Sequence, residues 1–184
     1  TNPVVKASSY LKHNATTTFI GITFDGQDVA EYTTYSYKTD TEKDLIFINC
    51  EFKNYTKSCV TIGDGEANVR NLLVDGCTFD ATRGIKLYAE GLFKTNILTV
   101  KNTDFSVINS KPAIVLCCAE SVTLEGNTYS STGVFELDLD GVPNGTMVTS
   151  DVPPTCINDN GACGVLVDGK IYTTVAQAAE VATS

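Results

Sequence analysis

A short segment built around an aromatic residue recurs five times along this chain. The recurring aromatic residues lie 28, 27, 26 and 24 residues apart and are Phe24, Phe52, Phe79, Phe105 and Tyr129. In most repeats, apolar residues precede the aromatic by five and seven positions, as Val74 and Leu72 precede Phe79. This alternation is the period-two pattern of a β-strand with one apolar face. A repeat of about 20 to 50 residues is typical of a solenoid, in which each unit covers the next. We therefore expect the five rings to form a buried aromatic stack.

The position three residues before each aromatic is restricted to glycine and asparagine. Its occupants are Gly21, Asn49, Gly76, Asn102 and Gly126. Glycine adopts positive φ without steric cost, and asparagine is one of the few other residues that tolerate it. We therefore predict a structural corner in the left-handed conformation at the end of this strand in every repeat.

Two solenoid architectures fit the spacing. The segment Leu72–Phe79 matches the short core of a leucine-rich repeat. However, the intervening segments contain second runs that alternate and are rich in β-branched residues. These runs are residues 59–62, 84–88, 113–116 and 134–139. More than one strand per repeat favours an all-β parallel β-helix of about five coils.

With Asn or Gly at the corner and stacked aliphatic and aromatic residues inside, residues 15 to 141 resemble the right-handed, pectate-lyase-like β-helix superfamily. Repeat modules of bacterial surface proteins and phage virion proteins contain this fold. The resemblance implies a right-handed solenoid and does not imply one activity.

The sequence predicts three regions. Residues 1–14 form an N-terminal cap, residues 15–150 the parallel β-helix, whose regular coils stop near residue 141, and residues 151–184 a linker with a C-terminal hairpin and short helix. Asp168 and Gly169 mark the hairpin turn, and Thr174 and Gln177 have the spacing of a capping box. The segment from Val167 to Ala179 resembles the sequence that opens β-helix modules in large bacterial surface proteins.

Charge and composition restrict the partners. The 184-residue chain has a net charge of −9, which disfavours nucleic acid and anionic membrane surfaces because both require a basic patch. It has no apolar run of about 18 residues, so we expect no membrane insertion. Because the sequence starts at Thr1, we expect a processed protein or an excised segment.

Four of the seven cysteines fall into two groups. Cys50 and Cys77 both stand two residues before an aromatic, so we expect them to stack in adjacent coils as small core residues. Cys156 and Cys163 flank a polar loop and are the candidate disulfide. Buried thiols suit folding under reducing conditions.

The residues that could perform chemistry are few. His13 is the only histidine, which excludes Ser-His-Asp triads and His-based zinc sites from the solenoid. If Phe135 points inward, Glu136, Asp138 and Asp140 share one outer face. With Lys86 and Tyr88 they form a possible binding face, which is either a solvated surface, a calcium site or a catalytic carboxylate pair. The alternating tyrosines of residues 32–37 are either packed or a stacking surface for sugar rings.

We therefore expect a non-catalytic structural or attachment module that needs no metal or other cofactor. We expect it at the cell surface, outside the cell or in a virion, with other protein chains of an assembly or surface glycans as partners. The alternative is a polysaccharide-acting enzyme, either a lyase or a glycoside hydrolase, on the same scaffold. Convergence of three or more outward charged side chains in a groove would favour the enzyme.

Overall fold

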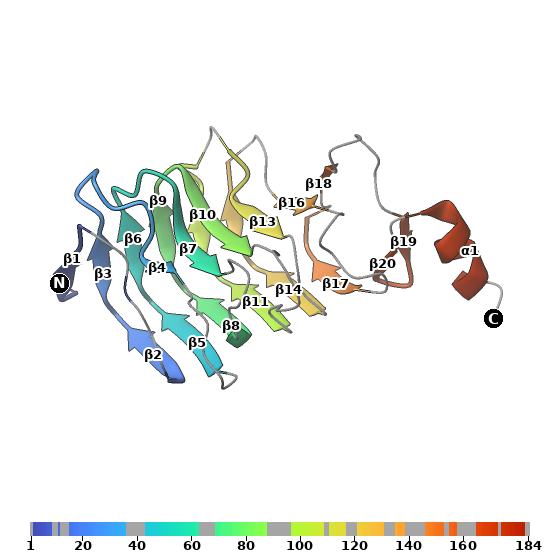
Figure 1. The fold of residues 1–184 in the computed structure, drawn as a ribbon, viewed down its shortest axis with the longest axis horizontal. Helices are drawn as coiled ribbons and strands as arrows, with labels where there is room; N and C mark the ends of the chain where they lie inside the picture. Colours follow the sequence, from blue (N-terminus) through green and yellow to red (C-terminus); the bar gives the residue numbers. More distant parts are fainter. Residues whose placement is uncertain are drawn as a thin grey trace.

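The structure is a computed structural model that describes residues 2–8, 11, 15–35, 43–62, 69–87, 97–108, 111–116, 121–130, 135–138, 146–152, 155–157, 165–172 and 174–182. Three β-sheets wind around a common core, and a hairpin and a short helix follow at the C-terminal end (Figure 1). The all-β parallel solenoid predicted from the repeats is confirmed.

Each sheet is a ladder of strands from successive coils. In the described part of the chain, sheet A has the order β1 (Val4–Lys6), β3 (Thr23–Asp25), β6 (Glu51–Lys53), β9 (Thr78–Asp80), β12 (Asp104–Phe105) and β15 (Thr128–Tyr129). Sheet B has the order β18 (Thr155–Ile157), β16 (Phe135–Asp138), β13 (Ile114–Leu116), β10 (Arg83–Leu87), β7 (Ser58–Ile62) and β4 (Thr34–Tyr35). Sheet C has the order β19 (Val165–Val167), β20 (Lys170–Tyr172), β17 (Thr146–Ser150), β14 (Ser121–Glu125), β11 (Ile97–Lys101), β8 (Val69–Asp75), β5 (Lys43–Ile48) and β2 (Thr17–Ile20).

The chain passes through sheets C, A and B in turn, so a coil contains three strands. The coils β5–β7, β8–β10 and β11–β13 are interior, because each has a complete coil on both sides. The triplets β2–β4 and β14–β16 repeat the same order at the two ends. The sequence predicts about five coils, whereas the structure has about three coils that are covered by a complete coil on both sides. Three strands per coil also decide against the leucine-rich repeat.

Alternation along sheet C explains the aliphatic part of the core. Leu45 and Phe47 point inward from β5 and are fully buried, while Ile46 between them is only partly buried. Residues in register with Leu45 and Phe47 repeat the pattern on β8, β11 and β14. A shift by one residue would turn this set outward, so burial of alternate residues fixes the register.

Sheet A supplies the aromatic stack. Neighbouring rings lie nearly parallel, with centroid separations of 5.2 Å for Phe24 and Phe52, 4.5 Å for Phe52 and Phe79, 4.8 Å for Phe79 and Phe105, and 5.5 Å for Phe105 and Tyr129. Each of the four phenylalanines is at most 1% exposed, and Tyr129 is partly buried. The rings therefore lie one above the next along the solenoid.

Strand pairing continues at both ends of the regular coils. The N-terminal region, predicted as an irregular cap, contains β1, which pairs in parallel with β3, and Leu11, which bridges to Thr34. At the other end, β17 and β18 continue sheets C and B beyond residue 141, near which the sequence predicts the regular coils to stop. Backbone pairing between coils extends further than the aromatic motif does.

The C-terminal hairpin extends sheet C, and the C-terminal helix contacts this hairpin. β20 runs antiparallel to β17 and to β19, and the turn between β19 and β20 holds Asp168 and Gly169 at φ of 47° and 77°. The helix α1 (Val175–Ala182) begins with one half of the expected capping box, in which the main-chain N–H of Gln177 donates to Thr174 Oγ1 over 3.2 Å.

Candidate functional site: the corner column

The corner column is the set of residues that turn the chain between sheets C and A. Every corner identified in the sequence has positive φ, and the values lie between 50° and 65° at Gly21, Asn49, Gly76, Asn102 and Gly126. The restriction to glycine and asparagine thus agrees with the backbone conformation. Hydrogen bonds also join each corner to the next coil. The main-chain N–H of the corner residue donates to a main-chain carbonyl there, as Gly76 N does to Lys101 O over 3.0 Å.

Glycine and asparagine alternate from coil to coil, and the side chains explain this. A Cβ on Gly76 would overlap Oδ1 of Asn49 in the preceding coil. A Cβ on Gly126 would lie only 3.0 Å from Oδ1 of Asn102. Each asparagine side chain therefore extends over the corner of the following coil and occupies the space that a side chain there would need.

Asn2 lies in line with this column, one coil before its first corner. The amide of Thr23 donates to Pro3 O over 2.9 Å, in the same way that Glu51 N donates to Ile22 O in the next coil. This register places Asn2 one coil before Gly21, and its Oδ1 lies 3.8 Å from the Cβ position of Gly21. The order Asn, Gly, Asn, Gly, Asn, Gly therefore runs from Asn2 to Gly126.

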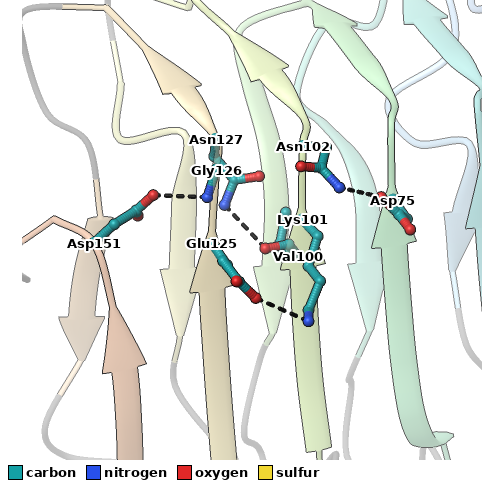
Figure 2. Close-up of polar contacts among 8 residues, drawn as sticks. All are labelled: Asp75, Val100, Lys101, Asn102, Glu125, Gly126, Asn127 and Asp151. Atoms are coloured by element: carbon teal, nitrogen blue, oxygen red, sulfur yellow. Dashed lines mark hydrogen bonds and ion pairs between the residues drawn. The ribbon is translucent and has the colours of Figure 1, made fainter.

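The outer side of the column carries polar contacts between coils (Figure 2). Asn102 Nδ2 donates to Asp75 Oδ1 over 3.0 Å, and Lys101 Nζ lies 2.9 Å from Glu125 Oε2. The hydrogen bond to Glu125 raises the pKa of Lys101. At the last corner, Gly126 N donates to Asp151 Oδ2 over 2.7 Å. The Asp151 carboxylate thus takes the place that a main-chain carbonyl has at the earlier corners.

The residues that follow the corners form a second series of hydrogen bonds between coils, which we call the inner ladder. Cys50 N donates to Cys77 Sγ over 3.4 Å, Cys77 N to Thr103 Oγ1 over 3.4 Å, and Thr103 N to Asn127 Oδ1 over 3.0 Å. Asn127 also donates to Val100 O (Figure 2). The side chain after each corner therefore satisfies an amide of the preceding coil, which would otherwise be a buried donor without an acceptor.

The thiols of this region are buried and reduced. Cys50, Cys59 and Cys77 are free, and none is more than 2% exposed. Burial raises the pKa of Cys59, and the contact with Cys50 together with burial raises that of Cys77. Cys59 and Cys77 therefore lack the thiolate character of a nucleophile.

The possible binding face of sheet B is only partly described. Lys86 is in register with Thr61 on one side and Val115 on the other, and Val115 is in register with Glu136. Thr61 and Val115 are each 4% exposed. The residues on either side of Lys86 in this row are therefore buried, which the sequence did not indicate.

The structure describes only two of the other residues predicted for this face. Glu136 and Asp138 lie on β16, and Tyr88 and Asp140 are outside the described residues. The disulfide between Cys156 and Cys163 stays a prediction, because Cys156 lies on β18 and Cys163 is outside the described residues.

Two further candidates are His13 and the tyrosine run. His13 and Tyr37 are both outside the described residues. The ring of Tyr32 faces Lys57, whose Nζ lies 5.8 Å from the ring centroid and 2.8 Å from Glu31 Oε1. A cation therefore occupies one face of this ring.

Several carboxylates bind polar groups of an adjacent coil. Thr23 Oγ1 donates to Glu51, and Asn71 Nδ2 donates to Asp44. Asn54 Nδ2 donates to Asp25 over 2.8 Å, and this bond, followed by the one from Gln27 N, lowers the pKa of Asp25. A lowered pKa is the reverse of what general-acid catalysis requires. In the ranges that the structure describes, no three His, Cys, Asp or Glu residues are grouped so as to hold a metal ion.

The comparisons with known proteins add no relatives. No family model, curated protein or solved structure matches this chain. In the described ranges, no helix has the length and apolar character needed to cross a membrane. The pectate-lyase-like superfamily remains a resemblance, and the parallel solenoid itself rests on the strand pairing.

Sequence reasoning missed Asn2, Thr103, Asn127 and Asp151. Asn2 stands three residues before Val5, as Gly21 stands three before Phe24, but the repeat is shorter there and valine replaces the aromatic. Thr103 and Asn127 share their position in the repeat with Cys50 and Cys77, two residues before the aromatic. The recurrence of this position could therefore have indicated that they belong to the same ladder. Asp151 gave none, because it acts through its side chain where other coils use the backbone.

Proposed function

We propose that this chain is a non-catalytic structural or attachment module of a cell-surface, extracellular or virion assembly. Its partners are other protein chains of the assembly or surface glycans. One observation carries the proposal: the described carboxylates for which a partner is identified mostly bind groups of the adjacent coil. Asp25, Asp44, Glu51, Asp75 and Asp151 each accept a hydrogen bond from a neighbouring coil. These groups hold coils together and do not converge on a common point.

The organisation of the corner column supports the same proposal. Its backbone, outer side chains and inner ladder each connect one coil to the next, so its polar groups serve to hold the solenoid together. Acid catalysis on a polysaccharide would instead need two carboxyl groups roughly 5 to 10 Å apart, one of them with a raised pKa. The pKa of Asp25 is lowered instead, because the Asn54 side chain donates a hydrogen bond to its carboxylate.

The test is incubation of the wild-type protein with uronate and neutral polysaccharides, with and without calcium. We expect neither new reducing ends nor unsaturated products. A glycan array in parallel measures attachment to sugars, and cross-linking of the protein on isolated surface or virion material measures attachment to protein chains. At least one of these two should be positive.

The matched control is the triple variant Glu136→Gln, Asp138→Asn, Asp140→Asn. It removes the predicted row of carboxylates and should keep the attachment measured for the wild type. Turnover that the wild type has and the triple variant lacks would replace the structural proposal with the enzyme.

A further inference from the structure

Cys50 and Cys77 occupy equivalent positions in two adjacent coils. Each follows a corner residue and directly precedes a strand of sheet A, and the first residues of these strands, Glu51 and Thr78, are in register. The register therefore places the two cysteine Cα atoms one coil spacing apart, which is about 4.8 Å. Disulfides are found at Cα separations of about 4.4 to 6.8 Å. The backbone thus allows a bond between these two sulfur atoms.

The two sulfur atoms also have equivalent surroundings. Each Sγ lies 3.4 to 3.6 Å from two main-chain carbonyls, one of them two residues earlier and the other in the preceding coil. These carbonyls belong to Ile48 and Phe19 for Cys50, and to Asp75 and Phe47 for Cys77. The main-chain N–H of Cys50 donates to Cys77 Sγ over 3.4 Å. The two side chains therefore point the same way, and their thiols stack between the coils.

The contact between the two thiols makes them chemically unequal. The hydrogen bond from the Cys77 thiol lowers the pKa of Cys50, against the effect of burial, and main-chain hydrogen bonds lower it further. The same contact, together with burial, raises the pKa of Cys77. Oxidants react with the thiolate form of a cysteine in preference to the thiol. Cys50 is therefore the sulfur that reacts first, and Cys77 is a second thiol beside it.

We propose that Cys50 and Cys77 are a site of reversible oxidation by hydrogen peroxide, which joins their two coils through a disulfide. The Cys50 thiolate attacks one peroxide oxygen, the O–O bond breaks, and Cys50 becomes a sulfenic acid while hydroxide leaves. The Cys77 sulfur then attacks the Cys50 sulfur, so that the S–S bond forms and the S–O bond breaks. The released oxygen takes the Cys77 proton, and the first hydroxide takes the proton that Cys50 had lost. The two thiols are thus oxidised to one disulfide, and peroxide is reduced to water.

The burial of the pair determines which oxidant reaches it. Cys50 is 1% exposed and Cys77 is 2% exposed, so an oxidant enters only when the corner opens locally. Hydrogen peroxide needs a smaller opening than a bulky disulfide does. Its reaction with Cys50 also removes the thiolate that holds the Cys77 proton, so the first step prepares the second. The resulting bond prevents the two coils from separating, and this proposal goes beyond the proposed function without resting on it.

The experiment treats the reduced full chain with equimolar hydrogen peroxide under native conditions, then alkylates the remaining thiols and maps the peptides by mass spectrometry. We expect a peptide pair linked through Cys50 and Cys77, which dithiothreitol separates. Cys59 is the matched control, because it is fully buried with a raised pKa but lies on β7 in sheet B. Cys59→Ser should leave the yield of the link unchanged. Absence of the link, or a link that forms only in urea, would overturn the proposal.

Two variants test the order of the steps. Cys77→Ser removes the second thiol, so Cys50 should remain a sulfenic acid and be labelled by dimedone. In Cys50→Ser, burial still raises the pKa of Cys77, so dimedone labelling of Cys77 should be lower by about tenfold or more. Equal labelling in the two variants would contradict the assigned roles. If either variant does not fold, the presence or absence of the link in the native wild type decides alone.

Discussion

At the scale of single residues, the corner column shows how one backbone requirement leads to a second, steric requirement. Positive φ admits both glycine and asparagine. Asn49 extends over Gly76, and Asn102 extends over Gly126. The corner position that follows each of these asparagines therefore has no space for a side chain. The alternation of the two residue types is therefore a packing relation between neighbouring coils, in addition to a conformational preference of each corner.

The first prediction compares two glycines with nearly the same φ. Gly76→Ala places a Cβ against Asn49, whereas the Cβ of Gly21→Ala meets only Asn2 Oδ1 at 3.8 Å. Both variants incur the strain of a non-glycine residue at positive φ, which costs about 1 to 3 kcal/mol. We expect Gly76→Ala to lower the free energy of unfolding by more than Gly21→Ala does, as measured by urea denaturation.

A double-mutant cycle gives the control for this prediction. Asn49→Gly removes the overlapping side chain, so the cost of Gly76→Ala should be smaller in that background. Additive effects of the two substitutions would show that Asn49 and Gly76 are not coupled.

The second prediction concerns pH and Tyr55, which is 3% exposed. Burial raises the pKa of Tyr55 to about 12. The folded state therefore retains this proton at a pH where the unfolded state has lost it, and the stabilisation present below pH 10 is lost as the pH rises towards 12. The slope is about 1.4 kcal/mol per pH unit.

Tyr55→Phe should remove this contribution. We expect the stability of the wild type relative to Tyr55→Phe to be constant from pH 7 to pH 9 and to fall above pH 10, as measured by urea denaturation at each pH. Other tyrosines and lysines titrate in both proteins, so the difference isolates Tyr55. Parallel curves through pH 11 would contradict the burial of this hydroxyl.

At the scale of elements, the aromatic stack compensates for the shortness of sheet A. Its strands contain only two or three residues, so they form few main-chain hydrogen bonds. Each buries one large ring against the ring of the next coil. Offset or stacked aromatic pairs contribute about 0.5 to 1.5 kcal/mol beyond the area that they bury.

The third prediction follows from the position of Phe79 in the middle of the stack, 4.5 Å from Phe52 and 4.8 Å from Phe105. Phe79→Ala should lower the free energy of unfolding by about 3 to 5 kcal/mol, because it leaves a cavity between two rings. Tyr129→Ala at the partly buried end is the matched comparison and should cost less. Equal costs in thermal or chemical unfolding would show that the stack does not act as a continuous column.

The sequence was informative about these elements to different degrees. Periodicity predicted sheet C, the corners and the aromatic stack, because side-chain burial and positive φ restrict residue types directly. It did not predict β18 or β1, whose pairing depends on backbone hydrogen bonds that many sequences make. It also could not show that Thr61 and Val115 are buried, because alternation along a strand indicates which face a side chain lies on and not whether that face is covered. The possible binding face was therefore the least predictable part.

At the scale of the whole molecule, the two ends of the solenoid are not equivalent. At the C-terminal end, sheet C continues through the antiparallel strands β20 and β19, which α1 contacts, and Asp151 satisfies the last corner amide. At the N-terminal end, β2 is the edge strand of sheet C among the described residues. A solenoid whose coils contact only their neighbours has a stability that is approximately the sum of coil and interface terms. The ends should therefore differ from the middle in how often they open.

The last prediction is a gradient of hydrogen-exchange protection along the chain. A coil with neighbours on both sides must break two interfaces to open, whereas an end coil breaks one, so local opening costs less free energy at the ends. We expect the slowest exchange at amides of the interior strands β8 and β11, including Leu72, Val74, Leu98 and Val100, which are at most 1% exposed. Exchange should be faster in β2 and β4, and in α1, where Ala178 is the buried residue. Phe79→Ala should accelerate exchange in β8 and β11 together, because it weakens the interfaces that those coils share. Uniform protection from β2 to β17 would instead mean that the solenoid opens only as one cooperative unit, and the additive description of its coils would then be wrong.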